Sequence, residues 1–433
     1  MVEMRHPHIA VIGGGIAGLA AGIHAARAGH RVTVYERASD PGGRARSQQA
    51  DGFTLNLGPH ALYPDAQDEL AALGIEVAGE KPPLTGIGVV DGKHHLLPSG
   101  PGSILRTGLL GPGEKVRAGL VLRDLQALDP SRIAGRTLAN WLDEVAGNGR
   151  LRALLETYFR LSTYADAPGL LDAAAAIRQF RAGTRGVRYL HGGWQTLVEA
   201  LADKFAAHGG TLRTGARVER VQESGDGFRV ALAGGVHDEA DAVILATTPR
   251  DAAGLLEDTA PPAALAALRE AVPVKAASLD IGVSRLPHPR RTFALGIDRP
   301  LYFQVHSRYG ALAPAGAQLL STAMYLPPGE EAWFDPDSVR QELEGWLDNL
   351  QPGWRDLQLT GRFLPSLTVS QALPLADAGR PAVDGSGVPG VFFAGDWAGD
   401  EGMLACTCLR SAAKATDLAI AHGTRTGSMA AIS

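Results

Sequence analysis

Hydrophobic positions near the start of the chain follow the pattern of a strand, a tight turn and a buried helix. Residues 8–12 form a short apolar run, residues 13–15 are glycines, and residues 16–28 are almost all small or apolar. Residues 31–36 alternate valines with more polar side chains, which predicts a second strand. Two strands separated by one helix are typical of a β-α-β unit, whose strands run parallel.

Later parts of the chain return to the same pattern of strands and helices. A helix is expected over residues 197–208, ended by two glycines, and another over about 409–422. The expected strands cover residues 211–222, 228–232, 241–246 and 390–395.

Two different stretches separate these pieces. Residues 66–190 have a largely helical pattern with Pro/Gly interruptions, and residues 261–385 alternate strands with one clear helix at 338–349. The order of the pieces predicts an α/β nucleotide-binding domain interleaved with an α+β domain that binds the substrate. The expected segments are 1–65, 191–260 and 386–433 for the first domain, and 66–190 and 261–385 for the second.

Composition narrows the function classes. The chain has 433 residues with a net charge of -5, so no broad basic face is available for nucleic acid. The only two cysteines, Cys406 and Cys408, are one residue apart, which disfavours a disulfide and a structural zinc site and suits a reducing cytoplasm. Residues 9–28 resemble a membrane span, but histidine, arginine and glycines interrupt them, so a buried strand and helix are expected. We predict no metal site.

The glycines after the first strand carry a dinucleotide-binding pattern. Gly13, Gly15 and Gly18 have the spacing Gly-x-Gly-x-x-Gly between a strand and a helix. The first allows the turn, the second lets a pyrophosphate approach, and the third lets helix and strand pack closely. Glu36 lies about 20 residues further on, where a carboxylate accepts ribose hydroxyls and disfavours the 2′-phosphate of NADP.

Six further segments carry motifs that belong together with this dinucleotide-binding pattern. The sequence reads Glu36-Arg-Ala-Ser-Asp-Pro-Gly-Gly-Arg after the second strand and Asn56-Leu-Gly-Pro-His shortly afterwards. Gly192-Gly-Trp, Ala216-Arg-Val with the later strand 241–249, and Gly390-Val-Phe-Phe-Ala-Gly-Asp-Trp complete the set. Together they resemble the superfamily of flavin amine oxidases, phytoene desaturases and protoporphyrinogen oxidases.

This resemblance implies a glutathione-reductase-like fold of the amine oxidase type, with a Rossmann-type domain that binds FAD non-covalently. It places Arg44 at the diphosphate, Val218 at the adenine and Asp396 at the ribitol, and it aims the start of the last helix at the flavin pyrimidine. The implied cofactor-binding residues are Gly13, Gly15, Ile16, Ala17, Gly18, Glu36, Arg37, Gly43, Arg44, Leu57, Gly58, Pro59, His60, Val218, Gly395, Asp396, Met403 and Leu404.

The resemblance is less informative about a catalytic base. Amine oxidases usually carry a lysine whose matching position here is near Leu279. Lys275 is either the one possible substitute or a solvated lysine at the start of its strand, and we favour the second. His60 is either a general base beside the flavin or a structural hydrogen-bonding residue. The absence of the lysine favours a desaturase-like dehydrogenase over an amine oxidase.

Two further strands carry candidate substrate contacts. Tyr302, Gln304 and His306 alternate along one strand, so they either face the pocket together or face water. Asp280 is either an anchor for a substrate cation or an edge residue paired with an arginine, and we favour the pair.

These observations predict an FAD-dependent dehydrogenase or oxidase that desaturates a mainly apolar small metabolite by hydride transfer to flavin N5. The alternatives are an amine oxidase that forms an imine and a non-catalytic dinucleotide-binding protein. Because only one complete glycine loop is present, oxygen or a quinone is the expected electron acceptor. A leucine-rich stripe between residues 104 and 128 is expected to be core, although peripheral membrane contact is conceivable. The oligomeric state is left open.

Overall fold

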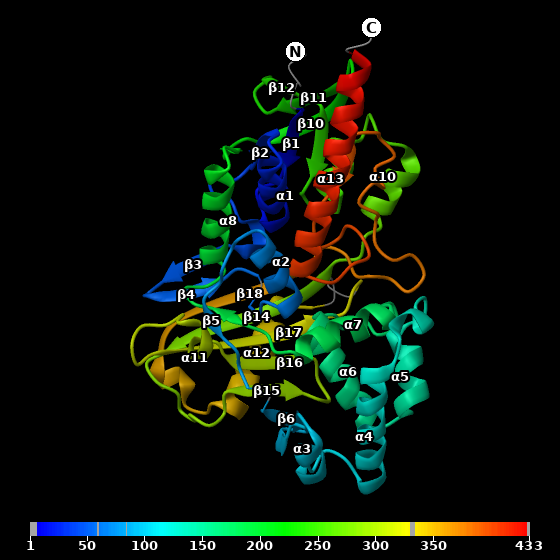
Figure 1. The fold of residues 1–433 in the computed structure, drawn as a ribbon. Helices are drawn as coiled ribbons and strands as arrows, with labels where there is room; N and C mark the ends of the chain where they lie inside the picture. The colour runs from blue at the N-terminus through cyan, green and yellow to red at the C-terminus, as the bar shows by residue number, and fades with distance from the viewer. Residues whose placement is uncertain (1–6, 59, 84, 330–333, 431–433) are drawn as a thin grey trace.

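The computed structural model describes residues 7–58, 60–83, 85–329 and 334–430, and a five-stranded parallel sheet forms its upper half (Figure 1). Helix α1 joins β1 to β2, and helices α8 and α13 pack against it. The strands, in spatial order, are β19 (Val391–Phe393), β13 (Ala242–Leu245), β1 (His8–Ile12), β2 (Arg31–Tyr35) and β9 (Thr211–Arg213). The helices are α1 (Ile16–Arg27), α8 (Gln195–Ala207) and α13 (Ala405–Ala430).

The first apolar segment of the sequence lies at the centre of this sheet. All five residues of β1 are buried, and most of α1 is buried between the sheet and α13. This burial explains the continuous apolar run and confirms the β-α-β unit. In the part of the chain that the structure describes, no helix is long and apolar enough to cross a membrane.

The prediction of one strand over residues 211–222 was wrong. Gly215 has a φ of +64°, and it separates β9 of the parallel sheet from β10 (Val218–Ser224). Strand β10 belongs to a separate antiparallel sheet with β11 (Gly227–Leu232) and β12 (His237–Ala240). A positive φ suits glycine and redirects the chain, so one polar stretch supplies strands to two sheets.

A seven-stranded sheet lies in the lower half of the molecule, below the parallel sheet (Figure 1). Its order is β18, β14, β17, β16, β15, β6 and β7, and helix α12 (Pro336–Leu350) packs on one face. The strands are β18 (Gln358–Ser370), β14 (Val274–Val283), β17 (Gln318–Leu326), β16 (Leu301–Val305), β15 (Phe293–Gly296), β6 (Ile87–Val90) and β7 (Lys93–Leu96). The largely helical stretch 66–190 therefore also contributes an edge hairpin, β6–β7.

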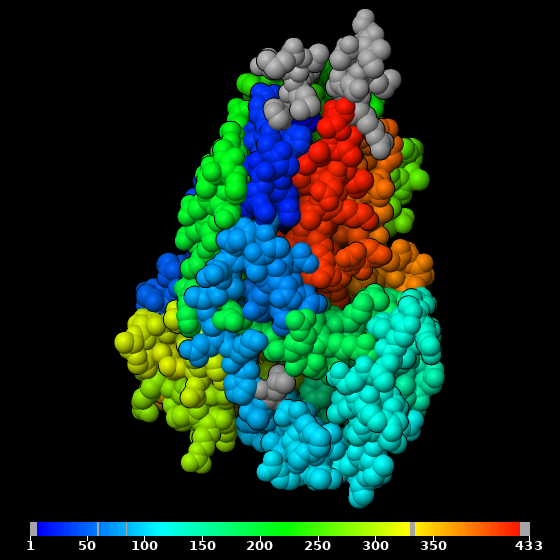
Figure 2. Space-filling model, viewed as in Figure 1, coloured from blue at the N-terminus to red at the C-terminus, as the bar shows by residue number. Residues whose placement is uncertain are grey.

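A block of helices packs against part of the opposite face of this sheet and stands at the lower right of the molecule (Figure 2). Its helices are α4 (Pro112–Ala127), α5 (Leu138–Ala146), α6 (Arg150–Thr163) and α7 (Ala173–Thr184), preceded by the short α3 (Pro101–Arg106). The leucine-rich stripe is divided between core and surface. Leu109, Leu110, Val121 and Leu125 are buried, whereas Leu105, Val116 and Leu120 are exposed.

The remaining elements connect these layers. Two of the helices contact α13 or β10, and two small two-stranded antiparallel sheets complete the set. They are α2 (Pro64–Ala72), α9 (Pro249–Leu255), α10 (Pro262–Arg269), α11 (Ser307–Gly310), β3 (Ser47–Ala50) with β4 (Phe53–Asn56), and β5 (Gly79–Glu80) with β8 (Tyr189–Leu190). Residues 261–385 thus contain α10 and α11 besides the expected helix, which extends over α12.

Candidate functional site

A single cavity of about 1090 Å³ runs from the parallel sheet to the seven-stranded sheet. At one end it is lined by Gly13, Glu36, Ala246 and Gly395, which follow the carboxyl ends of β1, β2, β13 and β19. At the other end it is lined by residues of β14, β16, β17 and β18. Parallel α/β sheets bind their ligands at the carboxyl ends of the strands, so this is the candidate active site.

The three glycines of the dinucleotide pattern have the geometry that their spacing predicts. Gly13 has a φ of +111°, and a Cβ on it would lie 2.5 Å from the carbonyl oxygen of Ala246. A Cβ on Gly18 would lie 1.8 Å from the carbonyl oxygen of Gly13, so only glycine lets α1 pack this closely. A Cβ on Gly15 would meet nothing within 4 Å, because this residue faces the open cavity.

Glu36 is held in place by two backbone amides. Its Oε2 accepts a hydrogen bond of 2.8 Å from the Gly14 N–H, and its Oε1 accepts one of 2.8 Å from the Ala38 N–H. The side chain lines the cavity, although the residue is only 8% exposed. A carboxylate has further lone pairs, so Glu36 can still accept hydrogen bonds from a ribose.

The structure brings nearly all of the expected cofactor residues to this one cavity. Gly18 lies behind the glycine loop, and Pro59 falls outside the described residues. The others line the cavity: Gly13, Gly15, Ile16, Ala17, Glu36, Arg37, Gly43, Arg44, Leu57, Gly58, His60, Val218, Gly395, Asp396, Met403 and Leu404.

Arg44 and Asp396 form a bidentate ion pair with each other. The Arg44 guanidinium donates from Nη1 to Oδ2 of Asp396 at 2.9 Å and from Nη2 to Oδ1 at 2.8 Å. The Asp396 side chain is 2% exposed and that of Arg44 is 37% exposed. The resemblance implied separate contacts with the diphosphate and the ribitol, whereas the fold joins the two side chains across the cavity wall.

The residues that line the upper cavity fit FAD, the cofactor that the sequence predicts. The open space at Gly15 adjoins the N-terminus of α1, whose free N–H groups favour a phosphate. The indole Nε1 of Trp194 is buried without a partner on the cavity wall. Met403 and Leu404 precede α13 and direct its N-terminus at the cavity. Trp194 and Trp397 were missed as site residues, although each lies within a quoted glycine motif.

Lys275 lies outside the cavity. It is on β14 beside Ala276, and strand alternation turns it to the other face from Ala276 and Ser278, which line the cavity. None of the six lysines of the chain is among the described lining residues. The suggestion that Lys275 replaces the amine oxidase lysine is therefore not supported by its position.

Asp280 is paired with an arginine, as favoured from the sequence. Its Oδ2 accepts a hydrogen bond of 2.7 Å from Nη2 of Arg362, and Asp280 is 1% exposed. The expected edge position was wrong, because β14 lies between β17 and β18. The pair leaves no net charge for a substrate cation at this position.

A buried network of tyrosine and histidine lies beneath the lower cavity. The hydroxyl of Tyr302 lies 3.0 Å from Nε2 of His306 and 3.1 Å from the hydroxyl of Tyr189. The rings of His306 and His60 have centroids 4.3 Å apart. Tyr302 and His60 line the cavity, whereas His306 lies behind them. Both faces of β16 are buried, so the polar face that could have met water instead forms this network.

Burial keeps these groups uncharged. It lowers the pKa of His60, although the carboxylate of Asp280 acts in the opposite direction. Burial and then the neighbouring His60 hold the pKa of His306 well below 6.5. Burial raises the pKa of Tyr302 well above 10. At neutral pH both imidazoles are therefore uncharged, and the burial that keeps them so also makes them weak bases.

The cysteines are poor nucleophiles, and the described residues gather no metal site. Both thiols are free, and burial raises the pKa of Cys406 to about 11 and that of Cys408 further. Cys408 lines the cavity as a small residue of α13. Over the described part of the chain, no three His, Cys, Asp or Glu side chains are grouped so that they could hold a metal ion.

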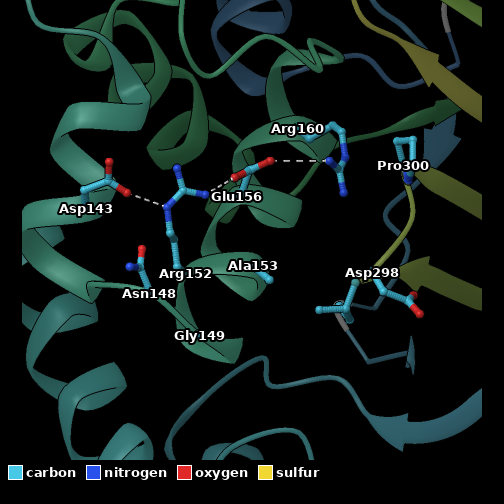
Figure 3. A pocket seen from close by; sticks show the side chains of 10 residues that line it. Asp143, Asn148, Gly149, Arg152, Ala153, Glu156, Arg160, Asp298 and Pro300 are labelled. Atoms are coloured by element: carbon cyan, nitrogen blue, oxygen red, sulfur yellow. Dashed lines mark hydrogen bonds and ion pairs between the residues drawn. The ribbon is translucent and has the colours of Figure 1, made fainter. Parts of the chain in front are cut away.

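A second cavity of about 540 Å³ lies between α5, α6 and the turn that joins β15 to β16 (Figure 3). Its two arginines pair with acidic side chains of the same cavity. Arg152 bonds Asp143 and Glu156 at 2.6 Å each, and Arg160 lies 3.8 Å from Glu156. No residue of the glycine loop lines it, so it is separate from the cofactor site.

Comparisons with known proteins agree with this geometry. Residues 16–420 match the model of the family described as flavin containing amine oxidoreductase. The phytoene dehydrogenase of Streptomyces griseus is 31% identical over 282 residues, which are 57% of this chain and 55% of that protein. The alignment thus spans about half of that relative.

Solved structures share the fold at low identity. An oxidoreductase from Methanosarcina mazei superposes with a TM-score of 0.78 at 18% identity, covering 95% of this chain and 100% of the other. The cyclohexylamine oxidase of Brevibacterium oxydans IH-35A gives a TM-score of 0.70 at 17% identity, covering 97% and 99%.

Proposed function

Because the chain belongs to the flavin containing amine oxidoreductase family and is an FAD-dependent oxidoreductase, we propose that it dehydrogenates a mainly apolar small metabolite in a desaturase-like reaction. The product has a new C=C or C=N bond. One observation carries this proposal: the nucleotide cradle opens, within one cavity, onto an uncharged chamber lined by alanines, aliphatic side chains, tyrosine rings, serines and threonines. Family membership and this chamber favour an enzyme over a non-catalytic dinucleotide-binding protein.

The chain positions the reactants rather than supplying the redox chemistry. When bound, FAD accepts a hydride at N5 from a substrate C–H bond. Glu36 holds a ribose, and the N-terminus of α1 holds the phosphates. The substrate loses a proton together with the hydride. His60 is the proposed acceptor, because it lines the cavity and its imidazole is neutral.

An amine oxidase that forms an imine is the second candidate. The family description favours it. The absence of lysine from the described cavity lining weighs against it, since Lys275 faces away.

We further propose that oxygen or a quinone reoxidises the flavin. The turn after β13 contains Thr247 and Thr248 in place of the glycines that a second pyrophosphate requires. Stopped-flow mixing of oxidised enzyme with NADPH or NADH tests this, and flavin reduction within seconds would contradict it.

Two measurements test the main proposal. Purified protein is expected to be yellow and to release FAD on heating; colourless protein that takes up no FAD refutes it. Anaerobic mixing with amines, porphyrinogens and polyenes then ranks the substrate classes by the rate of flavin bleaching. Rapid bleaching by a simple amine would reverse the order of the two candidates.

A further inference from the structure

Two buried hydroxyls in the lower cavity have no hydrogen-bond partner in the described protein. They are Oγ of Ser321 and Oη of Tyr325, and both residues are 2% exposed. Both residues lie on β17, an even number of positions apart, so they share one face of the sheet. Both line the cavity.

Neighbouring hydroxyls of the same cavity are satisfied by the fold. Tyr63 donates to the carbonyl oxygen of Ser162 at 2.9 Å, and Thr322 donates to that of Leu279 at 3.0 Å. Buried polar groups in native proteins almost always find a partner, because an unpaired one loses its hydration without compensation. A hydrocarbon in this cavity would leave the hydroxyls of Ser321 and Tyr325 unpaired. A ligand with a hydrogen-bonding group would satisfy them.

The lack of unpaired charges around this chamber restricts the kind of ligand group that these hydroxyls can bind. The cavity residues from the seven-stranded sheet and the end of α6 include no Asp, Glu, Lys or Arg: they are Tyr164, Ala276, Ser278, Tyr302, Ser321, Thr322, Ala323, Tyr325, Leu367, Thr368 and Val369. The adjoining charges are paired, Asp280 with Arg362 and Arg44 with Asp396. A carboxylate or an ammonium group would therefore lack a counter-ion here.

We propose that the substrate carries at least one neutral hydrogen-bonding group, such as a hydroxyl, a carbonyl or an unprotonated amine. Ser321 and Tyr325, about 13 Å apart along β17, are two separate points at which such a group binds. This inference rests on the proposed function and names its substrate class: a mainly apolar molecule that is not a pure hydrocarbon. The two hydroxyls then determine specificity, because a site built to hydrogen-bond its substrate rejects the analogue that lacks the group.

The first test compares the stability of FAD-loaded variants. Removing an unpartnered hydroxyl costs nothing, so Ser321→Ala and Tyr325→Phe should melt within about 1 °C of the wild type or above it. The matched controls Thr322→Val and Tyr63→Phe remove hydroxyls that are bonded internally, and each should lower Tm by about 1–2 °C. If Ser321→Ala and Tyr325→Phe lower Tm as much as the controls, the two hydroxyls serve folding and the proposal is overturned.

The second test measures binding to the oxidised holoenzyme by the change in its flavin absorbance. The probes are geraniol, its hydrocarbon counterpart 2,6-dimethylocta-2,6-diene, and geranic acid. We expect geraniol to bind about tenfold more tightly than the hydrocarbon, which is one good hydrogen bond, and geranic acid to bind more weakly than geraniol. The double variant Ser321→Ala/Tyr325→Phe should reduce the preference for geraniol to less than about threefold.

The outcomes separate this inference from the proposed function. Equal binding of alcohol and hydrocarbon, preference for the acid, or no binding of geraniol at millimolar concentration overturns the inference. None of these results depends on turnover, because the flavin stays oxidised throughout. The proposed function fails instead if the protein holds no FAD or if no substrate class bleaches it, and the stability comparison still reports on the two hydroxyls.

Discussion

Substituting alanine at two glycines of the same loop should separate cofactor binding from folding. A Cβ on Gly18 would lie 1.8 Å from the carbonyl oxygen of Gly13, and backbone cannot rotate away from such a contact. Overpacking of this kind costs about 1–3 kcal/mol, and the better helix propensity of alanine returns about 1 kcal/mol. Because the contact is with backbone, the upper part of the difference applies, and we expect Gly18→Ala to lower the free energy of unfolding by about 1–2 kcal/mol.

Gly15 should behave in the opposite way. Its φ of -78° and ψ of -174° suit alanine, and an added Cβ meets nothing within 4 Å, so the protein itself has room for it. The loss of a glycine N-cap costs only about 0.5–1 kcal/mol. The methyl group would occupy the space through which the pyrophosphate approaches. Gly15→Ala should therefore weaken FAD binding about 10- to 100-fold, which is 1.4–2.8 kcal/mol.

The assay has two parts. Urea unfolding of FAD-depleted protein measures the free energy of unfolding, and quenching of flavin fluorescence on titration measures the affinity for FAD. If Gly15→Ala binds FAD as tightly as the wild type, the assignment of the pyrophosphate to this loop is wrong. If Gly18→Ala is as stable as the wild type, the close contact of α1 with the loop is not a constraint on the fold.

Three further predictions concern ionisable groups of the site. Glu36→Gln should bind FAD about tenfold more weakly in the same titration, since an amide accepts from one oxygen only; unchanged affinity would remove Glu36 from the ribose site. Arg44→Met leaves the carboxylate of Asp396 buried without its cation and should cost about 2–4 kcal/mol in urea unfolding, and Asp396→Asn in the same protein should restore part of it. Because burial holds the pKa of His306 below its unfolded value of 6.5, its contribution to stability is fully present above pH 6.5 and is lost as the pH falls through the folded pKa. Tm should therefore fall less steeply below pH 6.5 in His306→Gln than in the wild type, and parallel curves would show that the imidazole does not titrate on unfolding.

Local sequence patterns were sufficient for the cofactor half of the protein. The position of Glu36 and the close packing at Gly18 depend on contacts within one β-α-β unit, whereas the close contact of Gly13 is with Ala246 after β13. Contacts within one β-α-β unit are made by residues close together in the chain, so the order of the residues is enough to predict them. The interleaving of two domains, inferred from the order of the pieces, stays a prediction. The misjudged strand at 211–222 shows the limit, because a single glycine turn divided it between two sheets.

The substrate half was decided by the tertiary structure. Period-two alternation placed Tyr302 and His306 on one face, but it could not say whether that face met water or a cavity. The order of the strands in the sheet decided that this face lines a cavity. Strands β14 and β17 are neighbours, and their pairing places Ser278 next to Ala323 in the cavity wall. Lys275 and Asp280 were equally ambiguous, since one residue of offset along β14 turns a side chain to the opposite face. The sequence by itself therefore determined the cofactor and the fold. Both depend on contacts between residues close in the chain or on the recurring pattern of strands and helices. The lining of the substrate chamber depends on pairing between distant strands, which no local pattern encodes.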